Sequence, residues 1–233
     1  MPEVGELVRR NLRYFLILSA AGLALRLIFF FRFPGVVTDS FVYGDIAKNW
    51  LEQGIFGLSG PEAVSPTYIR LPGYPAFLAL IFKIFGMEHY RAALVVQIFV
   101  DLGTCLLSAD ITLRLFGARP AKLAFLMASL CPFLANYSVA ALTETWEVFF
   151  TALAVNLALR ALEQQSYAYW AGCGAASAAA ILLRPDGGLV VIAIEMYLFI
   201  ICLWAPDPHI CRYTPPVRHC RPDDPLRGGP SAR

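Results

Sequence analysis

An acid in the segment after the first hydrophobic stretch, Asp39, is the first candidate for chemistry. Asp39, Tyr43 and Ala47 recur every four residues, so on a short helix they share one face. A carboxylate held there, at a membrane face, can act as a general base or a metal ligand. Because Asp39 followed by Ser40 is also typical of an N-cap, an equally good interpretation is that Asp39 only caps a helix over 41–53.

A basic candidate, Arg70, precedes a Pro-Gly turn at the start of the short apolar segment 74–86. The turn holds Arg70 at the level of the lipid headgroups. A guanidinium fixed there can bind a phosphate through two parallel hydrogen bonds. An arginine that binds ordinary lipid headgroups is the alternative.

Two more turns carry charged residues, Glu144 in one and Arg184 with Asp186 in the other. Each turn follows one hydrophobic stretch and precedes the next, so each lies at a membrane surface. Either could be an ordinary solvated turn. Their number on one face of the membrane favours a functional site.

The elements that position these residues are membrane helices. Of the 233 residues, 58% are hydrophobic and 15% are charged, whereas about a quarter are charged in a soluble domain. The apolar residues form long blocks, and about 20 helical residues cross a bilayer. We therefore predict an all-α polytopic membrane protein with about six transmembrane helices and outer interface helices. The sequence shows no basic surface of the kind that binds nucleic acid. The predicted spans are 12–31, 91–116, 121–141, 145–163, 167–183 and 188–205.

The distribution of Lys and Arg predicts the orientation, because short basic loops stay in the cytoplasm. Arginines precede the first span, which places the N-terminus inside. Segment 74–86 has 13 residues, too few to cross, so we expect it to lie at the outer interface. Arg119 and Lys122 are then cytoplasmic, and the loop with Asp39 and both charged turns share the outer face. The first span could instead be a signal peptide, but its apolar run continues past any cleavage point, which favours a retained anchor.

Ionisable residues inside spans are functional by default, or they hold helices together. Asp110 and Arg114 are four residues apart and are expected to pair. Asp101 belongs to a polar stripe that must face the bundle. Arg26, near the outer end of the first span, is expected to extend to the headgroups, and Glu195 lies within the last span.

The character of the chain changes at residue 206. Seven of the 16 prolines lie from residue 206 onward, with five arginines and no apolar run. We predict a transmembrane module over 1–205 and a disordered tail over 206–233. The six cysteines include no CxxC pair, so neither a disulfide framework nor a zinc site is indicated.

Taken together, these residues resemble the membrane glycosyltransferases of the GT-C fold. Within them, the chain is most similar to the dolichyl-phosphate-mannose-protein mannosyltransferase-like and aminoarabinose-transferase-like enzymes, from about residue 25 to residue 189. Each motif is weak alone, whereas their order and spacing are fairly specific. The motifs are Asp39-x3-Tyr43-x3-Ala47 with Gly54, the run from Arg70 to Pro75, Phe85-Gly86, Arg91, the run from Arg114 to Gly117, Pro132, the run from Leu142 to Glu144, and the run from Arg184 to Asp186.

The resemblance implies an inverting enzyme in the cell (inner) membrane, surrounded by membrane lipids. It would move a sugar from a polyprenyl-phosphate donor to a hydroxyl of a lipid, glycan or protein on the non-cytoplasmic side. Asp39 would be the catalytic base and Glu144 a second catalytic acid. An arginine would counter the negative charge on the leaving phosphate. The implied substrate-binding residues are Tyr43, Arg70, Tyr74 and Arg184. Some relatives bind a divalent metal cation at these acids. The resemblance therefore leaves open whether a metal binds here, and it assigns no cofactor with certainty.

Such enzymes continue through several more spans, so we expect this chain to be truncated. Whether it is active by itself is left open. One alternative is a non-catalytic membrane remnant. Another is a small transporter that uses Asp101 and Glu195 as an ion path. A transporter would need paired half-repeats or broken helices. The sequence shows no internal repeat and its polar groups concentrate on one face, which favours the glycosyltransferase.

Overall fold

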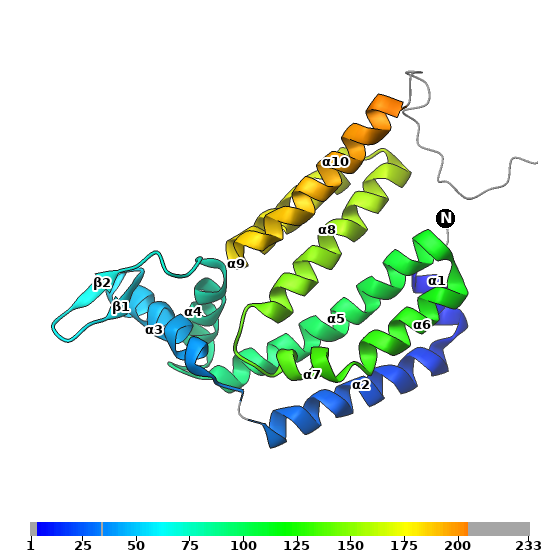
Figure 1. Ribbon diagram of the computed structural model, residues 1–233. Helices are drawn as coiled ribbons and strands as arrows, with labels where there is room; N and C mark the ends of the chain where they lie inside the picture. Colours follow the sequence, from blue (N-terminus) through cyan, green and yellow to red (C-terminus); the bar gives the residue numbers. More distant parts are fainter. Residues whose placement is uncertain (1–3, 34, 205–233) are drawn as a thin grey trace, which may run out of the picture.

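The computed structural model describes residues 4–33 and 35–204, which form an almost entirely helical protein (Figure 1). The predicted tail, 206–233, lies outside the described residues. In chain order the elements are α1 (Val4–Arg10), α2 (Leu12–Arg32), α3 (Thr38–Gln53), β1 (Gly57–Ser59), β2 (Val64–Pro66), α4 (Gly73–Phe85), α5 (Tyr90–Phe116), α6 (Ala118–Ser129), α7 (Pro132–Ser138), α8 (Glu144–Gln164), α9 (Tyr167–Leu183), a 3-10 turn η1 (Pro185–Gly187) and α10 (Gly188–Trp204).

The long apolar helices confirm a helical membrane protein. Within the described residues, α2, α5 and α8 are long and apolar enough to cross a membrane, and α6 with α7 is a fourth candidate, bent by 53° at its break. The other two predicted spans correspond to α9 and α10, which have 17 residues each and so lie at the lower limit for a span. Helix α4 has 13 residues, too few to cross.

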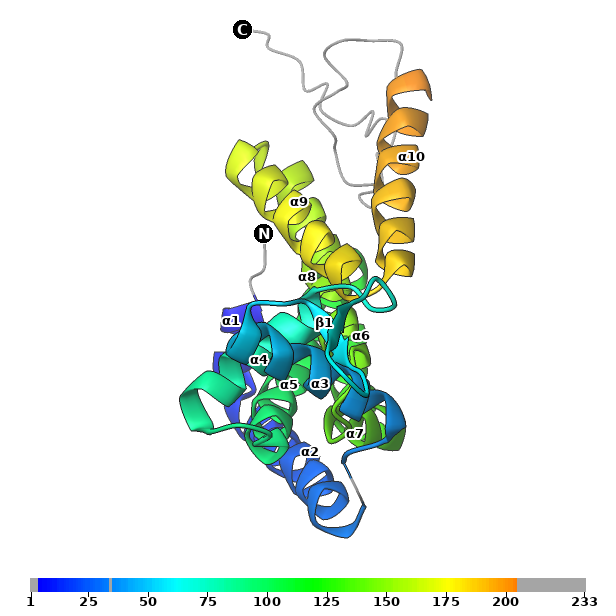
Figure 2. The ribbon, with the colours of Figure 1, turned by 90° about the vertical axis from the view of Figure 1, so that its left-hand side faces the viewer.

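Helix α5 is the centre of the bundle and contacts α2, α4, α6, α7 and α8 (Figure 1). Helix α9 packs on α8, and α10 contacts both of them while it diverges from α9 (Figure 2). Helices α3 and α4 pack together at one end of the bundle, and the β1–β2 hairpin projects from them. This small layer is the part of the fold that carries the first two charged segments.

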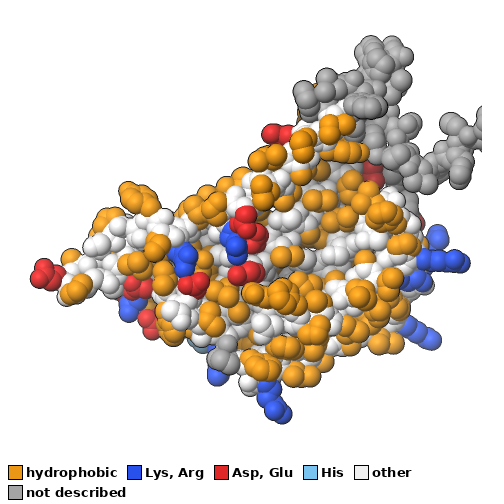
Figure 3. Space-filling model, viewed as in Figure 1, with side chains coloured by type: hydrophobic (Ala, Val, Ile, Leu, Met, Phe, Trp, Pro, Cys, Tyr) orange, Lys and Arg blue, Asp and Glu red, His pale blue; other side chains and the backbone are white. Residues whose placement is uncertain are grey.

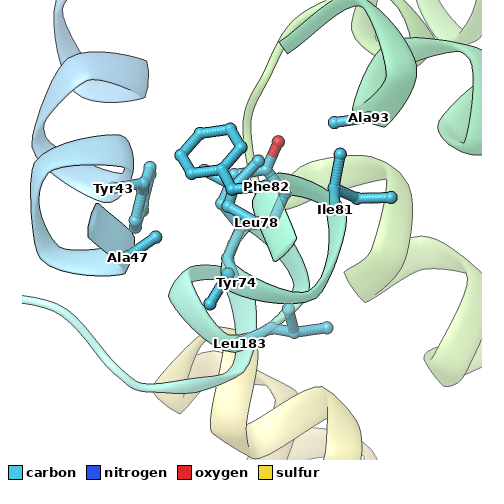
Figure 4. Packing of buried hydrophobic residues seen from close by; sticks show 9 residues of the cluster. Tyr43, Ala47, Tyr74, Leu78, Ile81, Phe82, Ala93 and Leu183 are labelled. Atoms are coloured by element: carbon cyan, nitrogen blue, oxygen red, sulfur yellow. The ribbon is translucent and has the colours of Figure 1, made fainter. Parts of the chain in front are cut away.

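The layer is held by the face of α3 that the four-residue spacing predicts. Tyr43 and Ala47 are buried, with exposed fractions of 8% and 0%. They face Tyr74, Leu78 and Phe82 of α4, with one residue each from α5 and α9 closing the cluster (Figure 4). Burying such side chains contributes on the order of 1.5–3 kcal/mol for each large one. The packing therefore fixes α3 on α4.

The β1–β2 hairpin is fastened to the opposite face of α3. The Asp45 carboxylate accepts hydrogen bonds from the Ser59 backbone N–H and hydroxyl, both at 2.7 Å. The Asn49 amide donates to the Gly57 carbonyl at 3.1 Å. Asp45 is therefore a structural residue that supports the β1–β2 hairpin.

Arg26 does not extend to the headgroups, and that expectation is wrong. It is fully buried, and its Nε donates to Oδ2 of Asp101 at 2.6 Å. Its Nη1 donates to the carbonyls of Gly22 and Ser129, at 2.9 and 2.8 Å. Ser129 is the last residue of α6, where the break before α7 leaves a carbonyl without a helical partner. Backbone groups at membrane depth must be satisfied by protein, so Arg26 stabilises the break.

The predicted pair of Asp110 and Arg114 is present, with 3.3 Å between Oδ1 and Nε. Arg160 and Asn156 of α8 both donate to Asp110 Oδ2 at 2.7 Å. Arg114 also pairs with Glu163 of α8. The network joins α5 to α8 at the end of the bundle far from the α3/α4 layer, so its role is to hold these helices together.

Candidate active site

A cavity of about 440 Å³ lies where the α3/α4 layer meets the adjoining ends of α8 and α9. Four segments that are distant in the sequence line it: 39–43, 68–71, 142–144 and 183–186. Figure 3 shows acidic and basic side chains gathered there on an otherwise largely hydrophobic surface. The structure thus brings together the charged segments that the topology placed on one face. The predicted site residues in the lining are Asp39, Tyr43, Arg70, Glu144 and Arg184.

Asp39 and Arg70 form one ion pair across the cavity wall. Nη2 of Arg70 donates to Oδ1 of Asp39 at 2.8 Å, and the guanidinium carbon lies 5.3 Å from the centre of the Tyr43 ring, a cation–π distance. Asp39 does not cap α3. The helix begins at Thr38, and the hydroxyl of Ser40 accepts the backbone N–H of residue 37 at 3.1 Å. The carboxylate of Asp39 is therefore committed to Arg70 and to the cavity.

Arg184 is the centre of a second charged group, in which three carboxylates surround one guanidinium. Its guanidinium lies 3.4 Å from Glu144, 3.2 Å from Glu147 and 3.2 Å from Asp186. Burial lowers the pKa of Arg184, but the three carboxylates outweigh it and the net pKa is raised. Glu147 is a residue that the sequence reasoning missed. Its signal was the three-residue spacing from Glu144, which puts both acids on one face in the first turn of α8, where the helix dipole favours negative charge.

One backbone hydrogen bond ties the two halves of the cavity together. The N–H of Ala141 donates to the carbonyl of Gly35 at 2.7 Å. Gly35 lies four residues before Asp39, and Ala141 lies three residues before Glu144. The two acids are therefore positioned by segments that are anchored to each other.

Tyr74 lies outside the cavity lining and is fully buried. Its hydroxyl donates to Oε1 of Gln97 at 2.7 Å, and Nε2 of Gln97 donates to the carbonyl of Ala140 at 2.7 Å. Its ring lies 5.0 Å from that of Tyr43. In this geometry Tyr74 supports the cavity wall from behind.

Tyr43 stays in its neutral, hydrogen-bonding form. Burial raises the pKa of Tyr43; Arg70 opposes this rise, and Asp39 and Glu144 add to it. A phenol with a raised pKa keeps its proton and can donate it in a hydrogen bond. Tyr43 is therefore suited to orient a ligand.

Two polar atoms at the cavity have no hydrogen-bond partner among the described residues. They are Nε of Arg70, a donor, and Oε2 of Glu144, an acceptor, and both are buried. A buried polar atom without a partner costs about 1–3 kcal/mol, more when charged. A ligand with a hydroxyl and an anionic group would satisfy both.

The arrangement does not fit a divalent cation. In residues 4–33 and 35–204, no three His, Cys, Asp or Glu side chains are grouped as metal ligands. The carboxylates of Asp39, Glu144 and Asp186 each face an arginine instead. A guanidinium thus stands where a cation would have to bind.

A family model gives the independent comparison. The model described as dolichyl-phosphate-mannose-protein mannosyltransferase matches residues 66–211, well over half of the 233 residues. The chain belongs to the dolichyl-phosphate-mannose-protein mannosyltransferase family. Membership indicates a membrane glycosyltransferase of the mannosyltransferase type, and it confirms the resemblance. Searches of curated proteins and of solved structures found no match.

The matched region of this mannosyltransferase-family chain includes Arg70, Glu144 and Arg184 and begins after Asp39. The position of Asp39 in the site therefore rests on geometry: its ion pair with Arg70 and its place in the cavity lining.

A close approach at Gly73 packs the start of α4 against the end of α9 and gives a stability prediction. A Cβ on Gly73 would lie 2.7 Å from the carbonyl oxygen and 2.9 Å from the carbonyl carbon of Leu182 in α9. Because that neighbour is backbone, we expect Gly73→Ala to destabilise the protein by about 1–3 kcal/mol, measured by thermal unfolding in detergent. The control is Gly174→Ala in α9, where nothing lies within 4 Å. Equal midpoints for the two variants would contradict the close packing of α4 on α9.

Proposed function

We propose that the cavity transfers a sugar from a polyprenyl-phosphate donor to a hydroxyl acceptor on the non-cytoplasmic side of the membrane. One observation carries the proposal: four separate segments bring paired acids and arginines into one cavity, in a chain of the mannosyltransferase family. Acids can take the acceptor proton, and arginines can balance the phosphate.

In the proposed reaction Asp39 is the general base. The acceptor oxygen attacks C1 of the sugar, and its proton passes to the carboxylate of Asp39. The bond between C1 and the phosphate oxygen breaks on the opposite face, which inverts the configuration. Polyprenyl phosphate leaves with one more negative charge than the phosphate carried in the donor. A guanidinium in the cavity stabilises that charge as it develops. The side chain of Asp39 is 55% exposed, so an acceptor can reach it.

Glu144 has the supporting role. Its Oε1 faces Arg184 at 3.4 Å, whereas its Oε2 is buried and unpaired within the described residues. That oxygen can accept a hydrogen bond from a hydroxyl of the sugar or the acceptor. The hydrogen bond would orient the substrate for Asp39.

The end of the bundle opposite the cavity supports the proposed orientation. Lys and Arg side chains gather there in Figure 3. The hydroxyl of Tyr14 donates to the carbonyl of Lys122 at 2.8 Å, and the ammonium of Lys122 donates to Asn11 at 3.2 Å. The start of α2 and the start of α6 therefore lie together. A cytoplasmic N-terminus puts this basic end inside and the cavity outside.

The topology is tested by cysteine labelling. In a background without native cysteines, we expect Arg119→Cys to react with a membrane-impermeant maleimide only when the cytoplasmic side is accessible. Glu62→Cys, between β1 and β2, is the matched probe and should react from outside. Labelling of position 119 from outside would contradict the orientation if Glu62→Cys reacts from inside, and the non-crossing α4 if Glu62→Cys also reacts from outside.

The activity is tested with a labelled donor. Membranes containing the protein should move sugar from polyprenyl-phosphate mannose to an acceptor and release polyprenyl phosphate, above the level of membranes without it. Folded protein that gives no transfer would favour the non-catalytic membrane remnant.

A further inference from the structure

Resting on that function, we propose that Arg70, rather than Arg184, receives the donor phosphate, and that it releases Asp39 in doing so. Binding of the donor would then free Asp39, the general base of the reaction. The proposal follows from how the two arginines share their carboxylates.

The charge around the two arginines differs. Arg184 contacts three carboxylates, so its local charge is +1 − 3 = −2. Arg70 contacts one carboxylate, that of Asp39, so its local charge is +1 − 1 = 0. An incoming phosphate is repelled by the first group far more than by the second. Arg70 is therefore the favoured partner of the phosphate, and Arg184 is held by its acids.

The geometry at Arg70 leaves donors for a phosphate. A guanidinium has five N–H donors in one plane, and one is bonded to Asp39 through Nη2. The Nε–H of Arg70 is buried without a partner among the described residues. The guanidinium also lies over the Tyr43 ring, which fixes its position. A phosphate that reaches Nε and Nη2 would form the bidentate pair that arginine favours.

Such a phosphate competes with Asp39, because both anions would approach Nη2 of the same guanidinium and repel each other. The Asp39–Arg70 pair is partly exposed, with exposed side-chain fractions of 55% and 31%, and pairs of this kind are weak. A bidentate phosphate contact is stronger. Donor binding should therefore displace Asp39 and leave its carboxylate without a cation. A carboxylate without a bound cation is a better proton acceptor.

The test is binding of farnesyl phosphate to the detergent-solubilised protein, with farnesol and inorganic phosphate as separate arms. Asp39→Asn should bind farnesyl phosphate about two- to fivefold more tightly than the wild type, because a competitor of the strength of an exposed ion pair is removed. Arg70→Ala should weaken binding by about tenfold or more, and Arg184→Lys should change it little. Farnesol should not reproduce the pattern. Inorganic phosphate should show the same order of variants if the site recognises the phosphate alone.

Two controls separate exchange from simple repulsion. Glu144→Gln removes a negative charge from the same cavity but leaves the partner of Arg70 in place. Its increase in affinity for farnesyl phosphate should therefore be smaller than that of Asp39→Asn. In the double variant Asp39→Asn/Arg70→Ala, the gain from Asp39→Asn should vanish, which a double-mutant cycle measures.

The outcomes distinguish the inference from the function beneath it. Equal gains for Asp39→Asn and Glu144→Gln, or loss of binding in Arg184→Lys but not in Arg70→Ala, would overturn the exchange and leave a phosphate-binding site. Absence of farnesyl phosphate binding in every variant would overturn the proposed donor as well.

Discussion

Asp39→Asn is expected to fold and insert normally and to lower sugar transfer by about 10²-fold or more, the usual scale for losing acid–base help. Asn keeps the size of the side chain and an oxygen that can still accept from Arg70, so the packing of α3 on α4 should survive. It removes the negative charge that takes the proton. The measurement is the initial rate of transfer from labelled polyprenyl-phosphate mannose, in a form of the protein that shows activity.

The same variant separates the base from the phosphate site. If Arg70 exchanges partners, Asp39→Asn should lower kcat while the donor binds more tightly. Glu144→Gln should give a smaller loss of rate, because Glu144 orients the substrate. Glu62→Gln, between the two strands, is the matched control and should behave as the wild type does. Normal turnover by the Asp39→Asn protein would end its assignment as the base.

Arg26→Met is expected to lower the free energy of unfolding by about 3–5 kcal/mol, because it leaves the charge of Asp101 buried without a partner. It also removes the donor to the Ser129 carbonyl at the α6/α7 break. Thermal unfolding in detergent measures the loss. Arg32→Met, at the exposed end of the same helix, should be close to neutral.

The double variant Arg26→Met/Asp101→Leu tests the cause. Replacing a buried ion pair by apolar residues is often neutral or stabilising, so the double variant should recover most of the loss. A double variant as unstable as Arg26→Met would show that the hydrogen bond to Ser129 matters more than the charge.

The sequence predicted what depends on local periodicity and on chain topology. The spacing of Tyr43 and Ala47 identified the buried face of α3, and the four-residue spacing identified the pair of Asp110 and Arg114. Counting basic residues placed the charged turns on one face, and the structure brings those turns into one cavity.

Pairings between distant helices could not be read in this way. Arg26 and Asp101 are 75 residues apart, and nothing in the spacing of either residue indicates the other. Without that partner, an arginine near a helix end is naturally interpreted as reaching the headgroups. The burial of Tyr74 likewise depends on Gln97 in another helix. The sharing of carboxylates between Arg70 and Arg184 depends on side-chain geometry that a sequence does not contain.

The β1–β2 hairpin has a practical consequence. Its contacts with Asp45 and Asn49 fasten it to the side of α3 that faces away from the cavity. The residues at its tip, 60–63, are exposed, and their neighbours in the strands already hold the register, with Leu58 opposite Ser65. An epitope or a fluorophore inserted at the tip should leave the cavity untouched. In the proposed orientation, the hairpin is thus an attachment point by which the protein can be captured from outside the membrane.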